Sequence, residues 1–315
     1  MNRLSSRHVL GIEHMTVRDV ELVLDTADAL KDILDRPIKK VPPLRGRSVV
    51  HLFFEPSTRT RLSFELAAKR LSADTISVSA ASSSVVKGES LLDTALNIEA
   101  MRPDIIVLRH PLSRAPHFLA RHVDTPVINA GDGTNEHPSQ ALLDLFTVRE
   151  RFGRIAGLRI AIIGDIAHSR VAHSDIRAFS KMGAEVTVCG PGTMMPPYVE
   201  ALGARSARCV EEALDGADVV MALRIQKERE RRALVPSIRE YAQLYGITRE
   251  RLRLASPDVV LMHPGPVNQG VEIAPDVFED PRSVILDQVT NGVAVRMALL
   301  SLLIISDTNR EGGGT

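Results

Sequence analysis

The segment FFEPSTRTR, from Phe53 to Arg61, carries residue types that bind an anion. It starts at the end of an apolar run, turns at a proline and continues into a helical pattern, so Ser57 is placed to cap that helix. Free backbone N–H groups and the positive end of the helix dipole meet at such a point. The side-chain donors here are the hydroxyls of Ser57, Thr58 and Thr60 and the guanidinium of Arg59. The segment therefore predicts a site for a phosphate-like group.

Nucleotide chemistry finds little support in the sequence. No GxxxxGK[ST] segment occurs, which disfavours a nucleotide-hydrolysing P-loop. The segment IIGDIAHSR, residues 162–170, stands where a dinucleotide fingerprint would fall, but it has one glycine where GxGxxG has three. A nicotinamide- or flavin-dependent enzyme is therefore not favoured.

Short apolar runs alternate with helical patterns along the chain, as is typical of βαβ units and a parallel sheet. The elements predicted in the first half are helices over 17–34, 57–71 and 90–101 and strands over 48–54, 75–80, 104–110 and 126–131. Those predicted in the second half are strands over 158–165, 184–191, 217–224, 257–266 and 283–289 and helices over 170–183 and 292–305.

We therefore predict an α/β protein of two doubly wound parallel-sheet domains, residues 1–150 and 151–291, with an interdomain cleft. A chain of 315 residues exceeds what one compact core usually holds, which agrees with two domains. The helix over 292–305 is expected to pack back on the first domain, and the tail from Ser306 is expected to fray. Ligands of open α/β sheets bind beyond the carboxyl ends of the strands, so polar residues there are the candidates.

The composition excludes several classes of protein. The 39 Lys and Arg residues balance 39 Asp and Glu residues, so there is no overall basic field for nucleic acid or an anionic membrane. Cys189 and Cys209 form no CxxC pair, which disfavours a disulfide framework and a cysteine-based zinc site. The start resembles no signal peptide, and no run near 18 apolar residues occurs. We expect a cytoplasmic protein without metal or cofactor.

Several further motifs make the chain resemble the aspartate and ornithine carbamoyltransferases. FFEPSTRTR is similar to the carbamoyl phosphate motif of that family. The further motifs, in the family's order, are SVVKGES at 84–90, VLRHP at 107–111, EHPSQAL at 136–142, GDIAHSR at 164–170, LRIQKER at 223–229 and HPGP at 263–266. Together the motifs span most of the chain, so we expect the family's fold and chemistry.

The resemblance implies how carbamoyl phosphate is bound. The STRT residues 57–60 would hold the phosphate, and Arg109 would reach both the phosphate and the carbonyl oxygen. His137 would donate to the carbamoyl oxygen, and Gln140 would bind the amide nitrogen. His137 and Gln140 lie three apart at the start of a predicted helix, so they share a face.

The loop ASSSVVKGES, residues 81–90, implies an assembly. In the family this loop enters the active site of the neighbouring subunit. Lys87 is therefore expected to bind carbamoyl phosphate together with Ser83 or Ser84, of which spacing favours Ser83. This implies a homotrimer with shared active sites, and it leaves open a larger assembly with dihydroorotase or regulatory chains.

Two features favour aspartate over ornithine as the acceptor. LRIQKER resembles the aspartate-binding loop, and HPGP stands where ornithine enzymes usually carry HCLP. Arg170 and Arg224 suit the two carboxylates of aspartate, because the planar guanidinium binds both oxygens of a carboxylate. The aspartate-binding residues implied are Lys87, Arg170, Arg224, Gln226, Gly265 and Pro266. Glu55 is expected to pair with Arg170 and Arg229 in a closed state.

The expected reaction is direct attack of the α-amine of aspartate on the carbamoyl carbon, followed by loss of phosphate. No Ser-His-Asp or Cys-His arrangement is evident, and no residue stands out as a general base. The residues expected to act in catalysis are Arg59, Thr60, Lys87, Arg109 and His137. The alternatives are a carbamoyltransferase for ornithine or another amino acid, and a catalytically silent homologue that binds metabolites.

Overall fold

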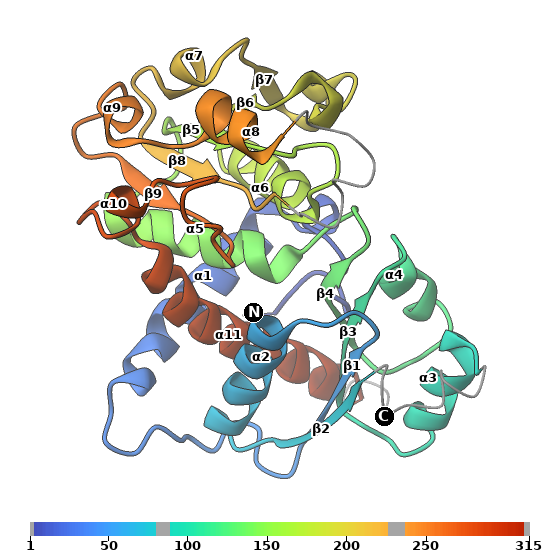
Figure 1. Ribbon diagram of the computed structural model, residues 1–315. Helices are drawn as coiled ribbons and strands as arrows, with labels where there is room; N and C mark the ends of the chain where they lie inside the picture. Colours follow the sequence, from blue (N-terminus) through green and yellow to red (C-terminus); the bar gives the residue numbers. More distant parts are fainter. Residues whose placement is uncertain (1–2, 80–88, 226–236, 312–315) are drawn as a thin grey trace. The chain divides into compact units, whose positions relative to one another are not determined.

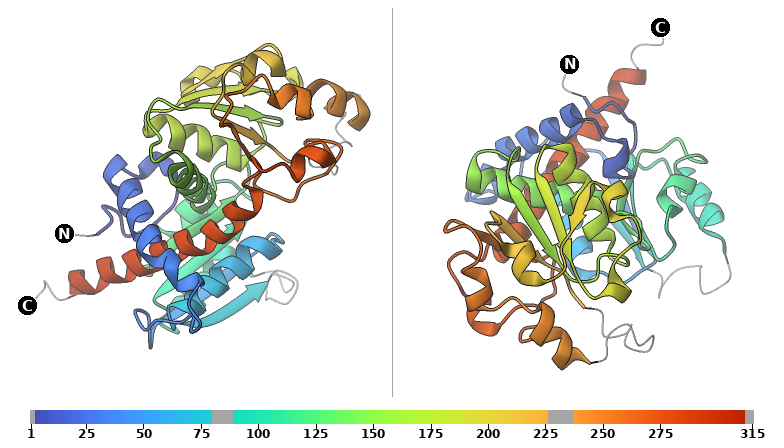
Figure 2. Two further views of the ribbon diagram at one scale, coloured as in Figure 1. Left: turned by 90° about the vertical axis from the view of Figure 1, so that its left-hand side faces the viewer. Right: turned by 90° about the horizontal axis from the view of Figure 1, so that it is seen from above.

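The computed structural model describes residues 3–79, 89–225 and 237–311. The chain divides into two compact units, one formed by Met1–Phe146 with Thr290–Thr315 and the other by Thr147–Val289. Each unit contains one parallel sheet with helices packed against it (Figures 1 and 2). The predicted α/β class with two parallel sheets is therefore confirmed.

The first unit is built on four parallel strands in the order β2-β1-β3-β4. The strands are β1 (Ser48–Phe53), β2 (Asp74–Ser79), β3 (Ile105–His110) and β4 (Val127–Asp132). The helices are α1 (Val17–Lys31), α2 (Thr58–Arg70), α3 (Leu91–Glu99), α4 (Ala115–Leu119), the start of α5 (Pro138–Phe152) and most of α11 (Ile285–Glu311). Short 3-10 turns cover Ile12–His14 and Asp32–Leu34.

Both faces of this sheet are covered, as the alternation of side chains along a strand requires. Val50 and Leu52 of β1 point to one face and pack in a cluster that includes residues of α3 and α4. The intervening His51 points to the other face, where its ring meets Phe64 of α2 edge-on. α11 lies against α2 on that second face, through Arg296 and Phe64. The C-terminal helix thus packs on the first unit, as predicted.

The second unit is built on five parallel strands in the order β7-β6-β5-β8-β9. The strands are β5 (Arg159–Ile163), β6 (Glu185–Cys189), β7 (Ala204–Ser206), β8 (Val219–Ala222) and β9 (Val260–Met262). The helices are α6 (Arg170–Lys181), α7 (Val210–Leu214), α8 (Ile238–Tyr245), α9 (Arg249–Leu252) and α10 (Pro275–Phe278), with 3-10 turns at Gly192–Met194 and Val199–Leu202. Apolar residues of β5, β8 and β9 form one core cluster with α7 and α9.

Two predictions of elements are wrong. The stretch 283–289 was expected to be a strand, but α11 begins at Ile285, and only a single bridge between Leu261 and Ser283 remains. Leu286 and Val289 are exposed, which fits one side of a helix better than a buried strand. The helix also continues to Glu311, so the backbone does not fray from Ser306.

α11 is also the helix whose composition needs an explanation. Among the described residues, Ile285–Ile305 is long and apolar enough to cross a membrane by length and hydropathy alone. However, 83% of its most apolar window is buried inside the structure, which is typical of a core helix. Polar residues interrupt the stretch, including the buried Asn291 and Arg296.

Candidate active site

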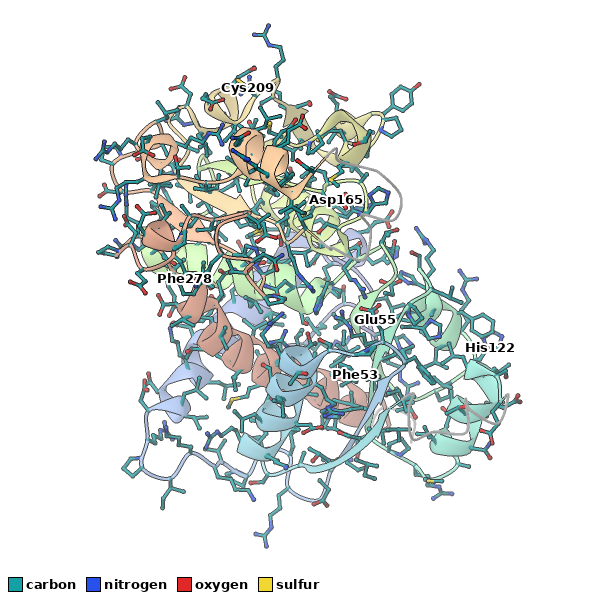
Figure 3. All side chains as sticks on the ribbon, viewed as in Figure 1. Phe53, Glu55, His122, Asp165, Cys209 and Phe278 are labelled. Carbon is teal, nitrogen blue, oxygen red and sulfur yellow. The ribbon has the colours of Figure 1, made fainter. Side chains whose placement is uncertain are left out.

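In the first unit, the predicted site residues lie at the carboxyl ends of the strands. Ser57 follows β1, Arg109 is the second-last residue of β3, and His137 follows β4. The parallel registers bring these strand ends to one edge of the sheet. Figure 3 shows Phe53 and Glu55 at the end of β1. Residues far apart in the sequence are therefore grouped by the order of the strands.

The N-terminus of α2 lacks the side-chain cap that five other described helices have. Ser57 occupies the N-cap position, but its side chain makes no capping hydrogen bond, so the prediction that it caps the helix is wrong. In α1, α3, α6, α8 and α9, by contrast, a Ser or Thr side chain accepts a hydrogen bond from the first turn. The first turn of α2 also contains no acidic residue. Its N–H groups can therefore serve a bound anion.

The three residues that follow Ser57 differ in exposure. Thr58 and Arg59 are exposed to solvent, whereas Thr60 is buried. An exposed guanidinium and a buried hydroxyl on consecutive positions of one turn can contact different parts of a ligand. This part of the structure provides both charge and directed hydrogen bonds for an anion.

Arg109 is held in place by two acceptors within the first unit. Its Nη2 donates to Glu55 Oε1 at 2.6 Å, and its Nη1 donates to the carbonyl oxygen of Ala130 at 3.1 Å. Glu55 follows β1 and Ala130 lies within β4, so the two acceptors come from the strands on either side of β3. Sequence reasoning missed the pair of Arg109 with Glu55. The signal that could have found it is that both residues stand at the ends of neighbouring parallel strands.

His137 and Gln140 are both buried at the start of α5. The carbonyl oxygen of His137 accepts from the N–H of Gln140 at 2.9 Å, so the two residues share the first turn. Nε2 of Gln140 donates to both carboxylate oxygens of Asp144, at 3.1 and 3.2 Å. Asp144 lies one turn further along α5 and was not among the predicted site residues.

In the second unit, the predicted aspartate-binding residues follow three strands that are neighbours in the sheet. Arg170 begins α6 after β5, Arg224 follows β8, and Gly265 with Pro266 follows β9. β8 pairs in parallel with both β5 and β9, so these segments leave the same edge of the sheet. Arg170 and Arg224 are each partly exposed.

The segment before Arg170 is fixed by local hydrogen bonds. The backbone N–H of His168 donates to Asp165 Oδ1 at 3.1 Å, and Nδ1 of the same ring lies 2.8 Å from that oxygen. Ser169 caps α6 by accepting from the N–H of Ala172. Asp165 follows β5 and is buried (Figure 3). The start of α6, and hence the backbone of Arg170, is therefore well anchored.

A buried acid, Glu272, links the segment that holds Arg224 to the segment after β9. Its Oε1 accepts from the N–H of Ile225 at 2.7 Å and from Nδ2 of Asn268 at 2.7 Å. Its Oε2 accepts from the N–H of Asn268 at 2.7 Å. Burial raises the pKa of Glu272, while these donors act in the opposite direction. Sequence reasoning missed this residue because its contact with Ile225 joins segments 47 residues apart.

The segment HPGP is anchored by a further pair of contacts in the second unit. The N–H of His263 donates to Gln288 Oε1 at 2.9 Å, and Nδ1 of His263 accepts from the N–H of Gly265 at 2.8 Å. Gly265 has a φ of +66°, a conformation that side chains other than glycine rarely adopt. Glycine at this position therefore matches the turn that follows β9.

Some predicted residues lie outside the described part of the chain. These are Ser83, Ser84, Lys87, Gln226 and Arg229. The expected pairing of Glu55 with Arg170 and Arg229 therefore stays a prediction. Within 3–79, 89–225 and 237–311, no group of three or more His, Cys, Asp or Glu side chains is arranged to hold a metal ion.

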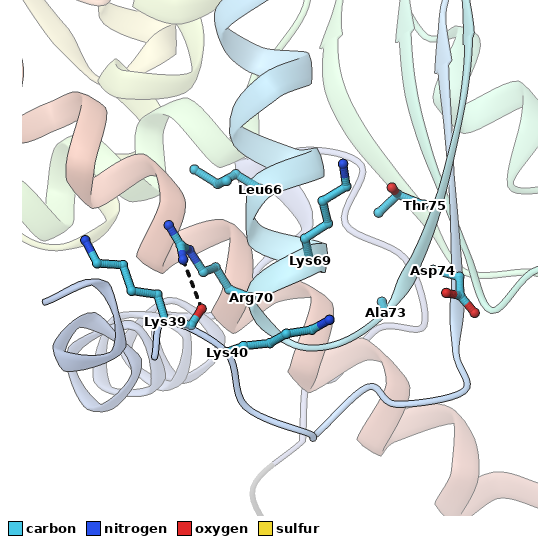
Figure 4. A pocket seen from close by; sticks show the side chains of 8 residues that line it. All are labelled: Lys39, Lys40, Leu66, Lys69, Arg70, Ala73, Asp74 and Thr75. Atoms are coloured by element: carbon cyan, nitrogen blue, oxygen red, sulfur yellow. Dashed lines mark hydrogen bonds between the residues drawn. The ribbon is translucent and has the colours of Figure 1, made fainter. Parts of the chain in front are cut away.

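A basic cavity of about 520 Å³ lies elsewhere in the first unit (Figure 4). It is lined by Lys39, Lys40, Lys69 and Arg70 and by Asp74, the first residue of β2. It therefore lies toward the amino ends of the strands, opposite to the predicted site. Lys69 and Arg70 stand in the last turn of α2, where cations complement the helix dipole. We do not assign this cavity to the active site.

The fold and the site together define a class: α/β proteins of two parallel-sheet units that carry cationic and hydroxyl side chains at the carboxyl ends of their strands. Residues 7–150 match the family model described as "Aspartate/ornithine carbamoyltransferase, carbamoyl-P binding domain". Residues 156–303 match the model described as "Aspartate/ornithine carbamoyltransferase, Asp/Orn binding domain". The chain belongs to the aspartate/ornithine carbamoyltransferase family.

Individual relatives come from both branches of this family. The aspartate carbamoyltransferase catalytic subunit of Syntrophotalea carbinolica is 61% identical over 297 residues, covering 94% of this chain and 95% of that protein. Aspartate transcarbamoylase from Trypanosoma cruzi, solved with N-(phosphonacetyl)-L-aspartic acid, has a TM-score of 0.87 and 31% identity, covering 95% of this chain and 96% of that one. Ornithine carbamoyltransferase from Pyrococcus furiosus has a TM-score of 0.84 and 28% identity, covering 95% and 97%. The fold is thus common to both branches.

Proposed function

We propose that this chain transfers the carbamoyl group of carbamoyl phosphate to the α-amine of L-aspartate, giving N-carbamoyl-L-aspartate and phosphate. The observation that carries the proposal is the 61% identity to an aspartate carbamoyltransferase catalytic subunit over nearly the whole of both chains. Because the fold is common to both branches, the acceptor rests on this identity and on Arg170 and Arg224. The reaction belongs to pyrimidine biosynthesis, and we place the protein in the cytoplasm.

In this proposal the first unit binds carbamoyl phosphate. The uncapped N-terminus of α2 and the STRT residues 57–60 receive the phosphate, and the exposed Arg59 adds a charge-assisted hydrogen bond. Arg109, held by Glu55, contacts both the phosphate and the carbonyl oxygen. Ser83 and Lys87 complete the phosphate site from the neighbouring subunit.

The carbamoyl group is recognised at both of its polar ends. Thr60, Arg109 and His137 donate to the carbonyl oxygen, where negative charge develops as the amine attacks. Gln140 accepts from the NH2 group. Burial of Thr60 and His137 supports this arrangement, because hydrogen bonds are stronger where water is excluded.

The second unit binds aspartate in this proposal. Arg170 and Arg224 each bind a carboxylate, and their positions after neighbouring strands support a common site. The other contacts are assigned to Gln226, Gly265, Pro266 and the neighbouring subunit's Lys87. Glu272 supports the site indirectly, because it fixes the segment that carries Arg224.

The chemistry is an acyl transfer with no covalent enzyme intermediate. The lone pair of the aspartate amine forms a C–N bond to the carbamoyl carbon, and a tetrahedral intermediate results. The C–O bond to the phosphate then breaks, and the phosphate departs with that electron pair and accepts the amine proton. The residues contribute by holding the reactants together and by stabilising the oxyanion.

The test is formation of carbamoylaspartate by the purified chain, supplied with carbamoyl phosphate and either aspartate or ornithine, without added metal. Activity with aspartate and none with ornithine is the expected result. Activity with ornithine alone would overturn the assignment of the acceptor. A folded protein that binds carbamoyl phosphate but transfers to neither acceptor would contradict the proposed catalysis and favour a silent metabolite-binding homologue.

A further inference from the structure

The orientation of the Gln140 side-chain amide is set by a residue outside the predicted site. Its Nε2 donates to both oxygens of Asp144, at 3.1 and 3.2 Å. A carboxylate only accepts hydrogen bonds, so the amide must turn its NH2 group toward Asp144 and its carbonyl oxygen Oε1 away from it. Among the described residues, no group donates to that Oε1. The amide is thus oriented to accept a hydrogen bond from a ligand.

A buried cation, Arg296 of α11, lies near the Asp144 side chain. Asp144 is 0% exposed and Arg296 of α11 is 4% exposed. Burial lowers the pKa of Arg296 to about 10, against the raising effect of the Asp144 carboxylate, so the guanidinium stays charged at neutral pH. Charges buried in this way are tolerated only when they compensate each other.

The guanidinium of Arg296 is itself held in place by three features. Its Nη1 donates to Ser63 Oγ of α2 at 2.8 Å, and its plane lies over the Phe64 ring, with Cζ 5.0 Å from the ring centroid. One turn earlier in α11, Gly292 leaves the space that Nη1 occupies. A Cβ atom at position 292 would lie 2.5 Å from that nitrogen and 3.2 Å from Leu143 Cδ2.

We propose that Asp144 is a positioning residue that keeps the Gln140 amide ready to accept a hydrogen bond. The site would then select acyl phosphates that carry an NH2 group over those that carry a methyl group. This inference rests on the proposed contact between Gln140 and the carbamoyl nitrogen. The selection arises because an NH2 group buried against Oε1 is satisfied, whereas a methyl group leaves Oε1 without a donor.

Two phosphonates that differ only at this group provide the test. Phosphonoacetamide carries NH2 and phosphonoacetone carries CH3, and neither can transfer its acyl group. Calorimetric titration of the wild-type oligomer should show a preference for phosphonoacetamide of roughly tenfold or more. In Asp144→Asn the neutral side chain can donate to Oε1, so the preference should fall roughly fivefold while phosphonoacetone affinity stays within about twofold.

A double-mutant cycle separates positioning from a structural role. Gln140→Leu should abolish the preference, and adding Asp144→Asn to it should change the preference no further, because the two residues act through one amide. An equal loss of affinity for both phosphonates in Asp144→Asn, or an unchanged preference, would overturn the inference. A preference in the double variant that differs from that of Gln140→Leu alone would also overturn it.

Gly292→Ala provides a second route if Asp144→Asn fails to fold. Alanine favours the helix, but its Cβ displaces the Arg296 guanidinium, so the preference should fall while phosphonoacetone affinity is retained. An unchanged preference in that variant would overturn the inference. A wild-type protein that binds neither phosphonate and forms no carbamoylaspartate would contradict the proposed function itself, which is a distinct outcome.

Discussion

At the scale of single residues, the two arginines proposed for the first unit differ in how they are held. Arg109 is fixed by Glu55 and by the carbonyl oxygen of Ala130. Arg59 extends from the first turn of α2 and is exposed. A fixed donor stabilises developing charge without rearrangement, whereas an exposed donor forms its strongest hydrogen bonds only on contact with the ligand. We therefore expect Arg109 to act as a preorganised donor and Arg59 as a phosphate clamp.

Replacement of Arg59 tests the phosphate clamp. Arg59→Ala should lower kcat/KM for carbamoyl phosphate on the order of 10²-fold or more, because a charge-assisted donor to the reacting group is lost. Lys69→Ala is the matched control: it removes an exposed cation from the other end of α2 and should leave the rate within about twofold. Steady-state kinetics with circular dichroism measures both. Comparable rates for the two variants would contradict the assignment of Arg59.

His51 predicts a pH dependence of stability. The side chain is fully buried on β1, and burial lowers its pKa to about 4. The unfolded chain binds a proton at this position near pH 6.5, whereas the folded protein does so only near pH 4. The unfolded state thus binds more protons within this window, so stability should be lost as pH falls from 6.5 towards 4, by at most about 1.4 kcal/mol per pH unit.

Urea denaturation at several pH values between 5 and 7 measures this effect. His51→Leu removes the titrating group and should make the midpoint less dependent on pH than in the wild type. His122→Leu, which removes an exposed histidine of the same unit, is the control and should keep the wild-type dependence. Equal slopes for His51→Leu and the wild type would show that His51 does not carry the effect.

At the scale of elements, the site is built from strand ends and helix starts. In the first unit, described site segments lie at the ends of β1, β3 and β4, and the N-terminus of α2 supplies N–H groups without a side-chain cap. In the second unit, Glu272 joins the segments that follow β8 and β9. Loops at a ligand site are thereby fixed by buried hydrogen bonds, which reduces the ordering required when the ligand binds.

Glu272→Gln tests this link between segments. The glutamine amide has one accepting oxygen, so its NH2 group would face at least one of the three donors from Ile225 and Asn268 and that hydrogen bond would be lost. The segment that carries Arg224 should therefore shift. We expect KM for aspartate to rise roughly tenfold or more, with carbamoyl phosphate affinity little changed. Kinetics and calorimetry measure the two quantities. Glu279→Gln, at an exposed acid of the same unit, is the control; a matching rise in KM there would contradict the proposed link.

At the scale of the whole molecule, the chain consists of two units, each with its own parallel sheet. The first unit is completed by the returning end of the chain, since α11 packs against α2 through Arg296. The helix that closes the first unit thereby places a charge near Asp144. A homotrimer with shared sites would add a further level, because Lys87 would then act in the neighbouring subunit.

Mixing inactive subunits tests the shared site. Arg59→Ala and Lys87→Ala each remove one side of a site, so each homotrimer should be nearly inactive. After subunit exchange, hybrid interfaces should contain some sites with both native residues, and activity should rise well above that of either variant. Carbamoylaspartate formation measures the rise, and mass spectrometry verifies the exchange. No recovery after verified exchange would indicate that each chain holds a complete site.

The sequence by itself predicted the parts of this protein that depend on local patterns. The α/β class and most strands followed from apolar runs and helical periodicity, and the anion-binding turn from the residues after a strand end. The other site segments followed from the resemblance to the carbamoyltransferases. β7 was missed because Ala204–Ser206 is a short edge strand with two exposed residues and no apolar run. The stretch 283–289 was mistaken for a strand because a short apolar run does not distinguish a strand from a buried helix.

Only the tertiary structure decided how the site residues are held. Arg109 meets Glu55, and Glu272 accepts from the N–H of Ile225, only because the fold brings segments distant in sequence together. Local sequence patterns set which face of an element is buried, but they carry no information about which distant polar groups meet there. A buried polar group must find a partner, and the packing of strands and helices determines which partner is within reach.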